Sequence, residues 1–302
     1  MPQKFSPIAN FVAGMPRAPA FGYLVFALDD LSERQIPHSV LAFWVKGKFG
    51  EAGQTGWHTA GIAVLTQPRE CAVAVGGGGQ SVAFGPPNYK VDERIGAPGD
   101  GPANRGPLRG VRTIADRVYA VGMDRQAYIR VGERDWRPMQ QGLTGTPPGQ
   151  TSGFEAVDGY SAEEIYAVGW DGEIWQWDGS SWTRQESPTN LILTDVCCAG
   201  DGQVYACGRQ GLLLRGRGPT WTIVEQDVID EDIWSLAWFG EALYLATFEA
   251  VYVMRGDTIE MVDFGEGKAL STYRLGVGPA SLWSVGAKDV MSFDGTSWTR
   301  ID

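Results

Sequence analysis

The chain has 302 residues, a formal net charge of −11, and a hydrophobic content of 43%. This composition excludes a wholly disordered chain, and 41 glycines favour many tight turns over long helices. The length suffices for one large all-β domain, and no apolar run approaches the roughly 18 residues that a membrane-spanning helix needs. The first residues lack a basic start followed by a compact apolar block, so we expect a cytoplasmic protein without a membrane partner.

Residues 1–61 contain two runs typical of strands, FGYLVFAL at 21–28 and VLAFWVKG at 40–47. These runs are enough for one irregular blade ahead of the rest of the chain. The same segment holds both histidines, His38 and His58. Two histidines exclude a multi-histidine metal site, and we do not expect a Ser-His-Asp arrangement.

A short motif then recurs along the chain. It reads AVAVG at 72–76, VYAVG at 118–122, IYAVG at 165–169, VYACG at 204–208, LYLAT at 243–247 and LWSVG at 282–286. The steps between the aromatic residues at its second position are 47, 39, 39 and 39 residues. A fixed period of about 40 residues indicates a propeller or solenoid. We expect these residues at equivalent places on successive second strands: Tyr119, Tyr166, Tyr205, Tyr244 and Trp283.

Each unit reads as four short strands separated by Gly, Asp or Pro, with Asp-Gly turns in WDGSSW (177–182) and FDGTSW (293–298). The predicted fold is therefore an all-β propeller of four-stranded antiparallel blades. We interpret residues 1–302 as one domain, with 1–61 as the irregular first blade and 62–302 as six repeats. Seven blades is the preferred count, and six blades with an N-terminal extension is the alternative.

The aromatic residues of the unit at 165–182 are predicted to pack between blades, with one exception. Trp170 follows the strand motif in a turn, together with Asp171 and Gly172. A tryptophan at a turn is a candidate for binding. The residues predicted to pack are Tyr166, Trp175, Trp177 and Trp182.

The unit EIYAVGWDGEIWQWDGSSWT resembles bacterial propeller repeats that read roughly D-V-W-A-V-G-x-x-G-x-I-x-x-W-D-G-x-S-W. Such repeats are similar to those of photosystem II stability and assembly factor-like proteins and of Kelch-like propellers. The match spans about residues 62–302, and the unit at 243–262 departs from it by lacking the closing tryptophan. The resemblance implies a propeller with a scaffold or binding role and names no partner.

The chain shows no motif for catalysis or for a cofactor. Neither HExxH nor GxSxG occurs, and VGGGGQS at 75–81 lacks the lysine of a phosphate-binding loop. The spacing of Cys71, Cys197, Cys198 and Cys207 favours buried free thiols over metal ligands. We therefore expect no catalytic residue, no metal ligand and no cofactor. Carboxylates are plentiful, so the alternative is a carbohydrate-active hydrolase or lyase with a carboxylate-based site.

Charge is unevenly distributed along the sequence. Residues 105–137 hold eight arginines against four acidic residues, whereas residues 225–266 hold eleven acidic residues against Arg255 alone. An acidic sector repels phosphates, so nucleic acid is not an expected partner. A basic protein surface fits better, because complementary charges speed and orient docking.

In a propeller, the connections between blades share one face with the turns between the two middle strands. That face receives the long loops 96–110, 140–153 and 225–232, and loops on a rigid scaffold often carry binding residues. We predict a non-catalytic protein-binding propeller, either an inhibitor such as an immunity protein or an assembly factor. A bound Ca²⁺ ion is the rival explanation for the acidic loop. The predicted partner-binding residues are Arg125, Trp170, Asp171, Arg209, Asp227, Asp230, Glu231, Asp232, Phe248 and Glu249.

Overall fold

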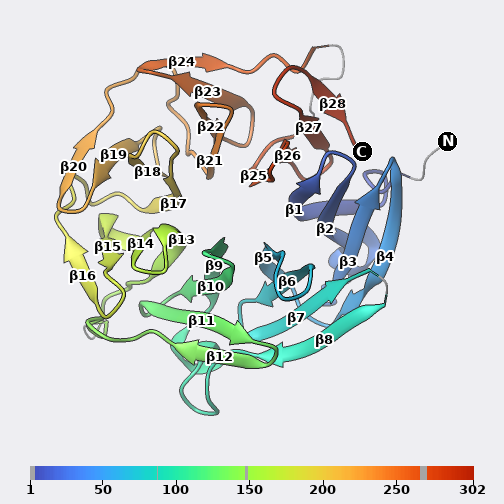
Figure 1. The fold of residues 1–302 in the computed structure, drawn as a ribbon, viewed down its shortest axis with the longest axis horizontal. Coiled ribbons are helices and arrows are strands. Elements are labelled where there is room, and N and C mark those ends of the chain that lie inside the picture. The colour runs from blue at the N-terminus through green and yellow to red at the C-terminus, as the bar shows by residue number, and fades with distance from the viewer. Residues whose placement is uncertain (1–3, 87, 147–148, 266–270) are drawn as a thin grey trace.

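The computed structural model describes residues 4–86, 88–146, 149–265 and 271–302. Figure 1 shows seven four-stranded antiparallel sheets arranged as blades around a central axis. This arrangement confirms the predicted fold and the count of seven blades over six. The segment expected to form an irregular first blade supplies a complete sheet of four strands.

The first four blades are built from sixteen strands. They are β1 (Ala9–Ala18), β2 (Phe21–Leu28), β3 (Ser39–Val45) and β4 (Lys48–Thr55); β5 (Thr59–Leu65), β6 (Cys71–Gly76), β7 (Gln80–Gly85) and β8 (Tyr89–Arg94); β9 (Leu108–Ile114), β10 (Arg117–Gly122), β11 (Gln126–Gly132) and β12 (Asp135–Pro138); β13 (Phe154–Ser161), β14 (Glu164–Gly169), β15 (Ile174–Trp177) and β16 (Trp182–Gln185). Short helical segments occur in connections: α1 (Asp29–Glu33), α2 (Pro102–Arg105) and the 3₁₀ turn η1 (Trp170–Gly172).

The last three blades follow the same plan. They are β17 (Leu193–Cys198), β18 (Val204–Gly208), β19 (Leu213–Arg217) and β20 (Thr220–Ile223); β21 (Ser235–Phe239), β22 (Ala242–Ala246), β23 (Val251–Arg255) and β24 (Thr258–Met261); β25 (Arg274–Val277), β26 (Leu282–Val285), β27 (Val290–Phe293) and β28 (Trp298–Arg300). The first strand of each blade lies next to the axis, and the fourth strand lies at the rim (Figure 1).

The repeated aromatic residues lie on the second strands, as predicted. They are Tyr119 on β10, Tyr166 on β14, Tyr205 on β18, Tyr244 on β22 and Trp283 on β26, and each is at most 3% exposed. Burial of such large rings contributes most where neighbouring sheets pack face to face. The repeat therefore encodes the packing between blades.

The packing of the fourth blade shows what the tryptophans of the unit 165–182 do. Trp182 lies 6.0 Å from the ring of Phe154 and 5.6 Å from that of Trp177, measured between ring centroids. The indole N–H of Trp182 donates to the carbonyl of Met139 in the preceding connection, at 3.0 Å. The same apolar cluster includes Tyr119 of the third blade, so the prediction of packing between blades is confirmed.

The glycine that closes the repeat motif has a steric role. A Cβ atom on Gly169 would lie 2.0 Å from the carbonyl oxygen of Gly153, and one on Gly208 would lie 2.4 Å from that of Ile192. Real Cβ atoms do not approach an oxygen so closely. The glycine therefore lets the chain that enters the blade pass against the end of its second strand.

An ion pair is buried between strands of the second and third blades. Arg130 on β11 donates to both oxygens of Glu93 on β8, at 2.9 and 2.6 Å, and the indole of Trp136 donates to the same carboxylate at 2.8 Å. Both charged side chains are less than 9% exposed. The bonds and charge of Arg130 outweigh the effect of burial and hold the pKa of Glu93 below its usual value.

The ring closes without exchange of a strand between the first and last blades, since each sheet is built from one continuous stretch. The carboxylate of Asp302 accepts hydrogen bonds from the backbone N–H groups of Phe5 and Ser6, at 2.7 and 3.0 Å. The amine of Lys288 donates to the carbonyl of Ala9 and to Asp29, at 2.9 and 2.7 Å. Side chains of both blades also share one apolar cluster.

Candidate functional site

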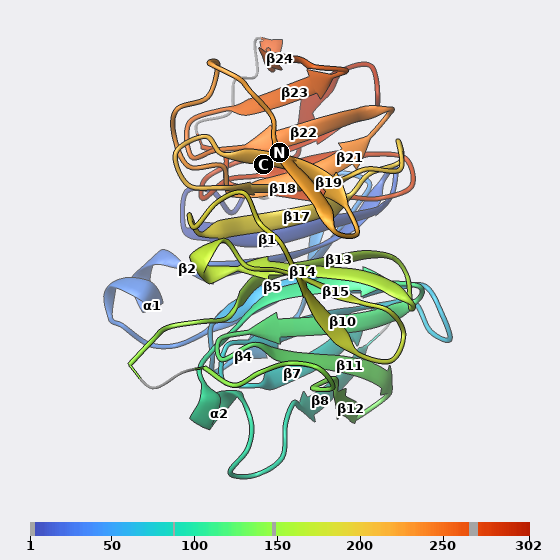
Figure 2. The same ribbon diagram turned by 90° about the vertical axis from the view of Figure 1, so that its left-hand side faces the viewer.

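The face that carries the connections between blades is called the long-loop face below. It consists of the loops 95–107, 139–153 and 224–234 and the turns between second and third strands, with residues 147–148 outside the described part. Figure 2 shows this face on its left-hand side, where α1 and α2 project. The long loops and the turns predicted to share a face therefore do so.

At the centre of the long-loop face the central channel opens into a cavity of about 730 Å³, here called the mouth cavity. Its walls come from the starts of the inner strands and the residues just before them. Charged and aromatic side chains dominate its lining: Arg109, Glu155, Trp170, Arg209, Trp234, Tyr273 and Arg274, with His58 among the others.

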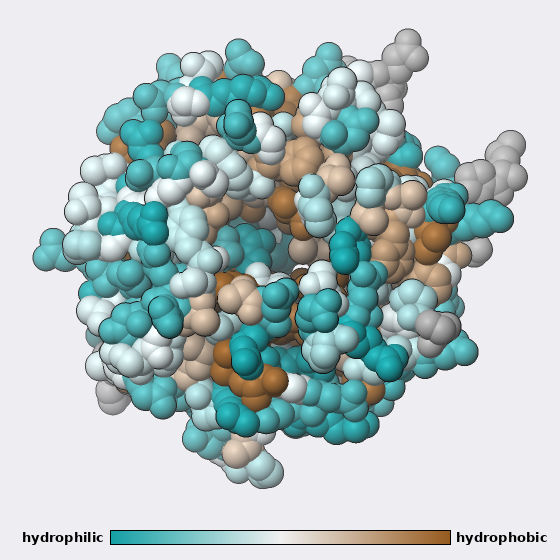
Figure 3. Space-filling model, in the orientation of Figure 1, coloured by the Kyte–Doolittle hydropathy of each residue, from teal (hydrophilic) through white to brown (hydrophobic). Residues whose placement is uncertain are grey.

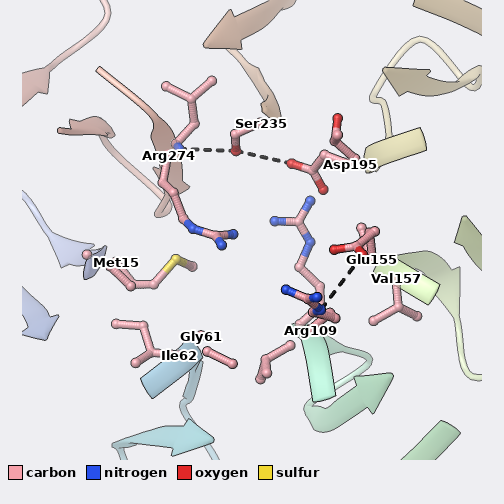
Figure 4. Close-up of a pocket in the computed structure, with 18 residues that line it drawn as sticks. Met15, Gly61, Ile62, Arg109, Glu155, Val157, Asp195, Ser235 and Arg274 are labelled. Atoms are coloured by element: carbon pink, nitrogen blue, oxygen red, sulfur yellow. Dashed lines mark hydrogen bonds and ion pairs between the residues drawn. The ribbon is translucent and has the colours of Figure 1, made fainter. Parts of the chain in front are cut away.

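The channel below the mouth cavity is narrow, with a free volume of about 80 Å³ (Figure 4). A chain of polar bonds ties its inner strands together. Arg112 on β9 contacts Asp158 on β13 at 3.2 Å, and the same carboxylate accepts from the N–H of Cys198 on β17 at 2.9 Å. Asp195 on β17 accepts from the hydroxyl of Ser235 and the N–H of Leu236 on β21, at 3.1 and 2.8 Å.

Both channel carboxylates therefore hold strands in place. Burial raises the pKa of Asp195, and the charges of Arg112 and Arg274 act in the opposite direction. The hydroxyl of Ser235 in turn accepts from the N–H of Leu275 on β25, at 3.2 Å, which extends the chain of bonds to a fifth inner strand. Such an arrangement supports rigidity of the channel wall.

The acidic loop 225–232 is held in a fixed shape by an uncharged side chain. The amide of Gln226 donates to the carbonyls of Gly211 and Ile229 at 2.9 and 2.7 Å. It also accepts from the N–H groups of Val228 and Ile229, at 2.9 and 2.8 Å. Ile229 is 3% exposed and anchors the loop, while Asp227 and Asp230 point to solvent.

The predicted triad within this loop divides into two roles. Asp232 pairs with Arg209 and accepts from the backbone N–H of Gln210 at 3.0 Å. Asp230 is exposed and Glu231 half-buried, and neither forms an ion pair within the described residues. Asp232 therefore positions Arg209, whereas Asp230 and Glu231 remain available on the surface.

An aromatic cluster lies beside the acidic loop at the rim of the mouth cavity. The rings of Phe248 and Tyr273 are stacked, with centroids 4.9 Å apart and planes 3° from parallel. Trp234 packs against both, at 5.3 and 5.6 Å. Phe248 is 55% exposed, although it is a large apolar side chain. Two guanidinium groups flank the rings, that of Arg209 over Trp234 at 4.9 Å and that of Arg274 over Tyr273 at 5.1 Å.

Sequence reasoning placed Phe248, Arg209 and the neighbouring Glu249 on this face and missed Trp234 and Tyr273. Both missed residues directly precede the first residue of an inner strand, and they lie one repeat of 39 residues apart. His58, Pro107 and Ile192 hold the same place in other blades, and all of them line the mouth cavity. The signal was therefore present in the register of the repeat.

Trp170 and Asp171 lie in the η1 turn on the long-loop face, as expected. The indole N–H of Trp170 donates to Glu155 at 2.7 Å, and the half-buried ring lines the mouth cavity. Asp171 is exposed in the left-handed region, with φ of 55°. Both residues are accessible from the mouth cavity or from the surface around it.

Arg125 differs from the expectation of an exposed binding residue. It is 6% exposed, because its guanidinium donates to both oxygens of Glu173 on the next blade, at 2.7 and 2.5 Å. It also donates to the carbonyl of Thr144 at 2.8 Å, which fixes the loop after β12. Arg125 therefore holds the long-loop face together from within and is not placed to touch a partner directly.

The basic and acidic stretches of the sequence differ in how many of their charged side chains form ion pairs in the folded protein. Seven of the eight arginines in the basic stretch 105–137 lie within 4.0 Å of a carboxylate. In the acidic stretch, Asp232 and Asp257 pair with arginines. The following form no ion pair within the part of the chain that the structure describes: Glu225, Asp227, Asp230, Glu231, Glu241, Glu249, Glu260 and Asp263.

Across the described ranges, no three His, Cys, Asp or Glu side chains gather so as to hold a metal ion. In the same ranges, no helix has the length and apolar character to cross a membrane. All four cysteines are free, and burial raises the pKa of the Cys71 thiol to about 11. This agrees with the predicted buried thiols, except that Cys198 is only partly buried.

The opening of the channel on the face opposite the long-loop face is smaller than the mouth cavity. Figures 1 and 3 look onto this face, which carries the short turns between first and second strands. The space-filling view in Figure 3 shows a hollow at its centre. Its volume is about 290 Å³, and Arg17, Asp158 and Trp238 contribute to its wall. The long-loop face therefore has the larger opening, the longer loops and the exposed aromatic cluster.

Comparison with known proteins finds a relative that matches along the full length of the chain. No family model matches it. It is 44% identical over 308 aligned residues to the immune protein Tsi7 of Pseudomonas aeruginosa strain PAO1, and the alignment covers 100% of both chains.

Solved structures with little sequence identity share the fold. The WD40 propeller domain of Doa1 has a TM-score of 0.67 at 10% identity, with 93% of this chain and 91% of that one covered. YCF48 from Cyanidioschyzon merolae has a TM-score of 0.65 at 13% identity, with 95% of both covered. YCF48 bound to a D1 peptide has a TM-score of 0.68 at 11% identity, with 94% of this chain and 91% of that one covered.

The full-length relationship to a protein named as an immune protein, together with the propeller fold, supports the predicted class, an immunity-type propeller. The resemblance to assembly-factor propellers is confirmed at the level of the fold. The chain belongs to the family of the immune protein Tsi7.

Proposed function

We propose that this protein confers immunity by binding a toxic protein through its long-loop face, with the acidic loop 225–232 against a basic surface of the toxin. The observation that carries this proposal is the charge asymmetry described above. The basic stretch is neutralised within the fold, while the acidic stretch leaves eight carboxylates without an ion pair among the described residues. Unpaired charges of one sign attract a surface of the opposite sign.

The rigidity of the acidic loop supports the same proposal. Gln226 and Ile229 fix its backbone, so the loop does not have to be ordered when a partner binds. A preorganised surface loses less conformational entropy on association than a mobile one. The proposed contacts of the loop are made by Asp227, Asp230 and Glu231.

The aromatic cluster supplies the apolar part of the proposed interface. Phe248 is exposed next to Trp234 and Tyr273, and two arginines flank the three rings. Tryptophan, tyrosine and arginine are enriched among the residues that contribute most to protein interfaces. We place the centre of the interface at this cluster, with the acidic loop at its edge. Glu249, next to Phe248, and Trp170, which lines the mouth cavity, belong to the same proposed footprint.

Reversal of two charges tests the role of the acidic loop. The probe is the toxic protein that copurifies with this chain from its own cells, identified by mass spectrometry and then purified. Asp230→Lys with Glu231→Lys should slow association at least tenfold at low salt, because the attraction that steers encounter becomes repulsion. Stopped-flow measurement across a salt series should show a weaker dependence on salt than in the parent.

The matched control reverses Asp92 and Glu163 to lysine, two exposed carboxylates outside the acidic stretch, on β8 and in the turn between β13 and β14. It changes the net charge by the same amount and should leave the association rate close to that of the parent. Asp232 is kept, because its bonds to Arg209 and Gln210 support the fold. Equal association rates for the loop variant and the parent at every salt concentration would contradict the proposal.

The aromatic anchor gives a separate prediction. Phe248→Ala should weaken binding of the same toxin by about 2 kcal/mol, roughly 30-fold in Kd, mainly through faster dissociation. The control is Met261→Ala, since Met261 is 64% exposed on the outer strand β24, away from the mouth cavity. Calorimetry gives both affinities, and the proposed anchor is wrong if the two variants bind equally well.

The cytoplasmic location expected from the sequence also stays a proposal. It fits four unpaired thiols, since disulfides are rare in that compartment. The kinship of the repeat motif with assembly-factor and Kelch-like repeats likewise remains a prediction, and the shared propeller fold supports it.

A further inference from the structure

The mouth cavity contrasts in charge with the acidic surface beside it. Three arginines line it, Arg109, Arg209 and Arg274, against one carboxylate, that of Glu155. The exposed carboxylates of the acidic loop lie outside the cavity. A positively charged cavity therefore opens beside the negatively charged acidic loop.

The three arginines differ in whether their guanidinium groups lie near a carboxylate. Arg209 pairs with Asp232, and Arg109 lies 3.8 Å from Glu155. The guanidinium of Arg274 forms no hydrogen bond or ion pair within the described ranges, and its contact is with the ring face of Tyr273. Figure 4 shows Arg274 and Arg109 reaching into the channel from opposite sides.

Asp195 also lines this part of the channel, where its Oδ2 accepts from the hydroxyl of Ser235 and the N–H of Leu236, and its Oδ1 accepts from the N–H of Val196. The fork of Arg274 reaches into the channel at the base of the mouth cavity, and none of its donors is bonded within the described ranges. A guanidinium binds a carboxylate with two parallel hydrogen bonds, which are among the stronger bonds in proteins. The cavity is large enough for the tip of a loop, because about 730 Å³ lies within the range of ordinary ligand pockets.

We infer that the mouth cavity receives an acidic side chain of the bound toxin, whose carboxylate is held by Arg274 with Arg109 beside it. This inference rests on the proposed function and adds a second element to the interface. The toxin surface would then carry an acidic projection surrounded by basic residues. The two charge signs would fix the orientation of the complex, since a rotated partner would bring like charges together.

The test compares Arg274→Met with Arg215→Met in the full-length protein. Arg215 lies on β19 and pairs with an exposed carboxylate, Asp257, far from the mouth cavity. Arg274→Met should weaken binding of the purified toxin at least tenfold, and Arg215→Met should change it less than twofold. Arg274→Lys should recover part of the affinity, because the charge remains and the fork is lost. Equal melting temperatures would show that the variants are folded.

Malonate, a small dicarboxylate, serves as a second probe. It should compete with the toxin for the parent protein and should not compete for Arg274→Met. Binding of the toxin by Arg274→Met within twofold of the parent would overturn the inference. Malonate binding that depends on Arg274 and leaves toxin affinity unchanged would also overturn it, since the cavity would then hold only a free anion.

The outcome also separates this inference from the proposed function. If reversal of Asp230 and Glu231 slows association while Arg274→Met has no effect, the proposed function holds and the inference fails. If neither variant changes binding, both fail. If only Arg274→Met weakens binding, the mouth cavity is the main determinant and the role of the acidic loop is wrong.

Discussion

Glu93→Ala is expected to lower the free energy of unfolding by about 3–5 kcal/mol. The substitution leaves the guanidinium of Arg130 buried without its partner, and it also removes the acceptor of the Trp136 indole. An uncompensated buried charge is among the most destabilising changes in a protein core. Urea unfolding followed by tryptophan fluorescence measures the effect.

Two variants control for this prediction. Glu93→Met combined with Arg130→Leu removes both charges and should be clearly more stable than Glu93→Ala. Asp135→Ala breaks the exposed pair with Arg137 and should have no measurable effect. If Glu93→Ala and Asp135→Ala unfold at the same urea concentration, the buried pair does not stabilise the fold as argued.

The stabilisation that Glu93 provides is expected to depend on pH, and the shift of its pKa fixes the direction. Its pKa is lower in the folded protein than the ordinary value of 4.5. The folded state therefore favours the charged form, and the stabilisation is fully present above about pH 4.5. It is lost as the pH falls through the lower folded-state pKa. The difference in stability between the parent and Glu93→Ala should accordingly shrink on acidification below pH 4.5.

Trp182→Ala is expected to destabilise the protein by about 3–5 kcal/mol, as for other large buried aromatic residues. Trp182 is 3% exposed, it packs against Phe154 and Trp177, and its indole N–H binds the carbonyl of Met139. The substitution leaves a cavity and an unpaired carbonyl between two blades. Trp182→Phe should retain part of the stability. A variant that melts with the parent but no longer binds the toxin would show that this tryptophan serves binding.

The blades could be predicted because each unit packs its sheet against the neighbouring sheets in the same way. Five of the seven second strands carry the repeated aromatic residue, and a glycine closes the motif in five of the six repeats. The first blade has neither at the usual spacing, yet its apolar runs at 21–28 and 40–47 form β2 and β3. Composition alone therefore identified its two middle strands.

The site was only partly predictable, because its contacts join residues that are far apart in sequence. Charge and position in a turn were enough to place Asp230, Phe248 and Trp170 on the long-loop face. They could not show that Arg125 meets Glu173, 48 residues away, and is thereby buried. The same limitation applies to Trp234 and Tyr273, whose proximity depends on how two adjacent blades are set around the axis.

The closure of the ring has a consequence for how the chain folds. Neighbouring blades come from adjacent stretches of sequence, so most contacts between blades close short loops at small entropic cost. The contact between the first and last blades joins residues as far as 297 positions apart. Because neither blade borrows a strand from the other, each sheet can complete its hydrogen bonding from its own stretch of chain. Closure then docks two finished blades and is expected to be the last step of folding.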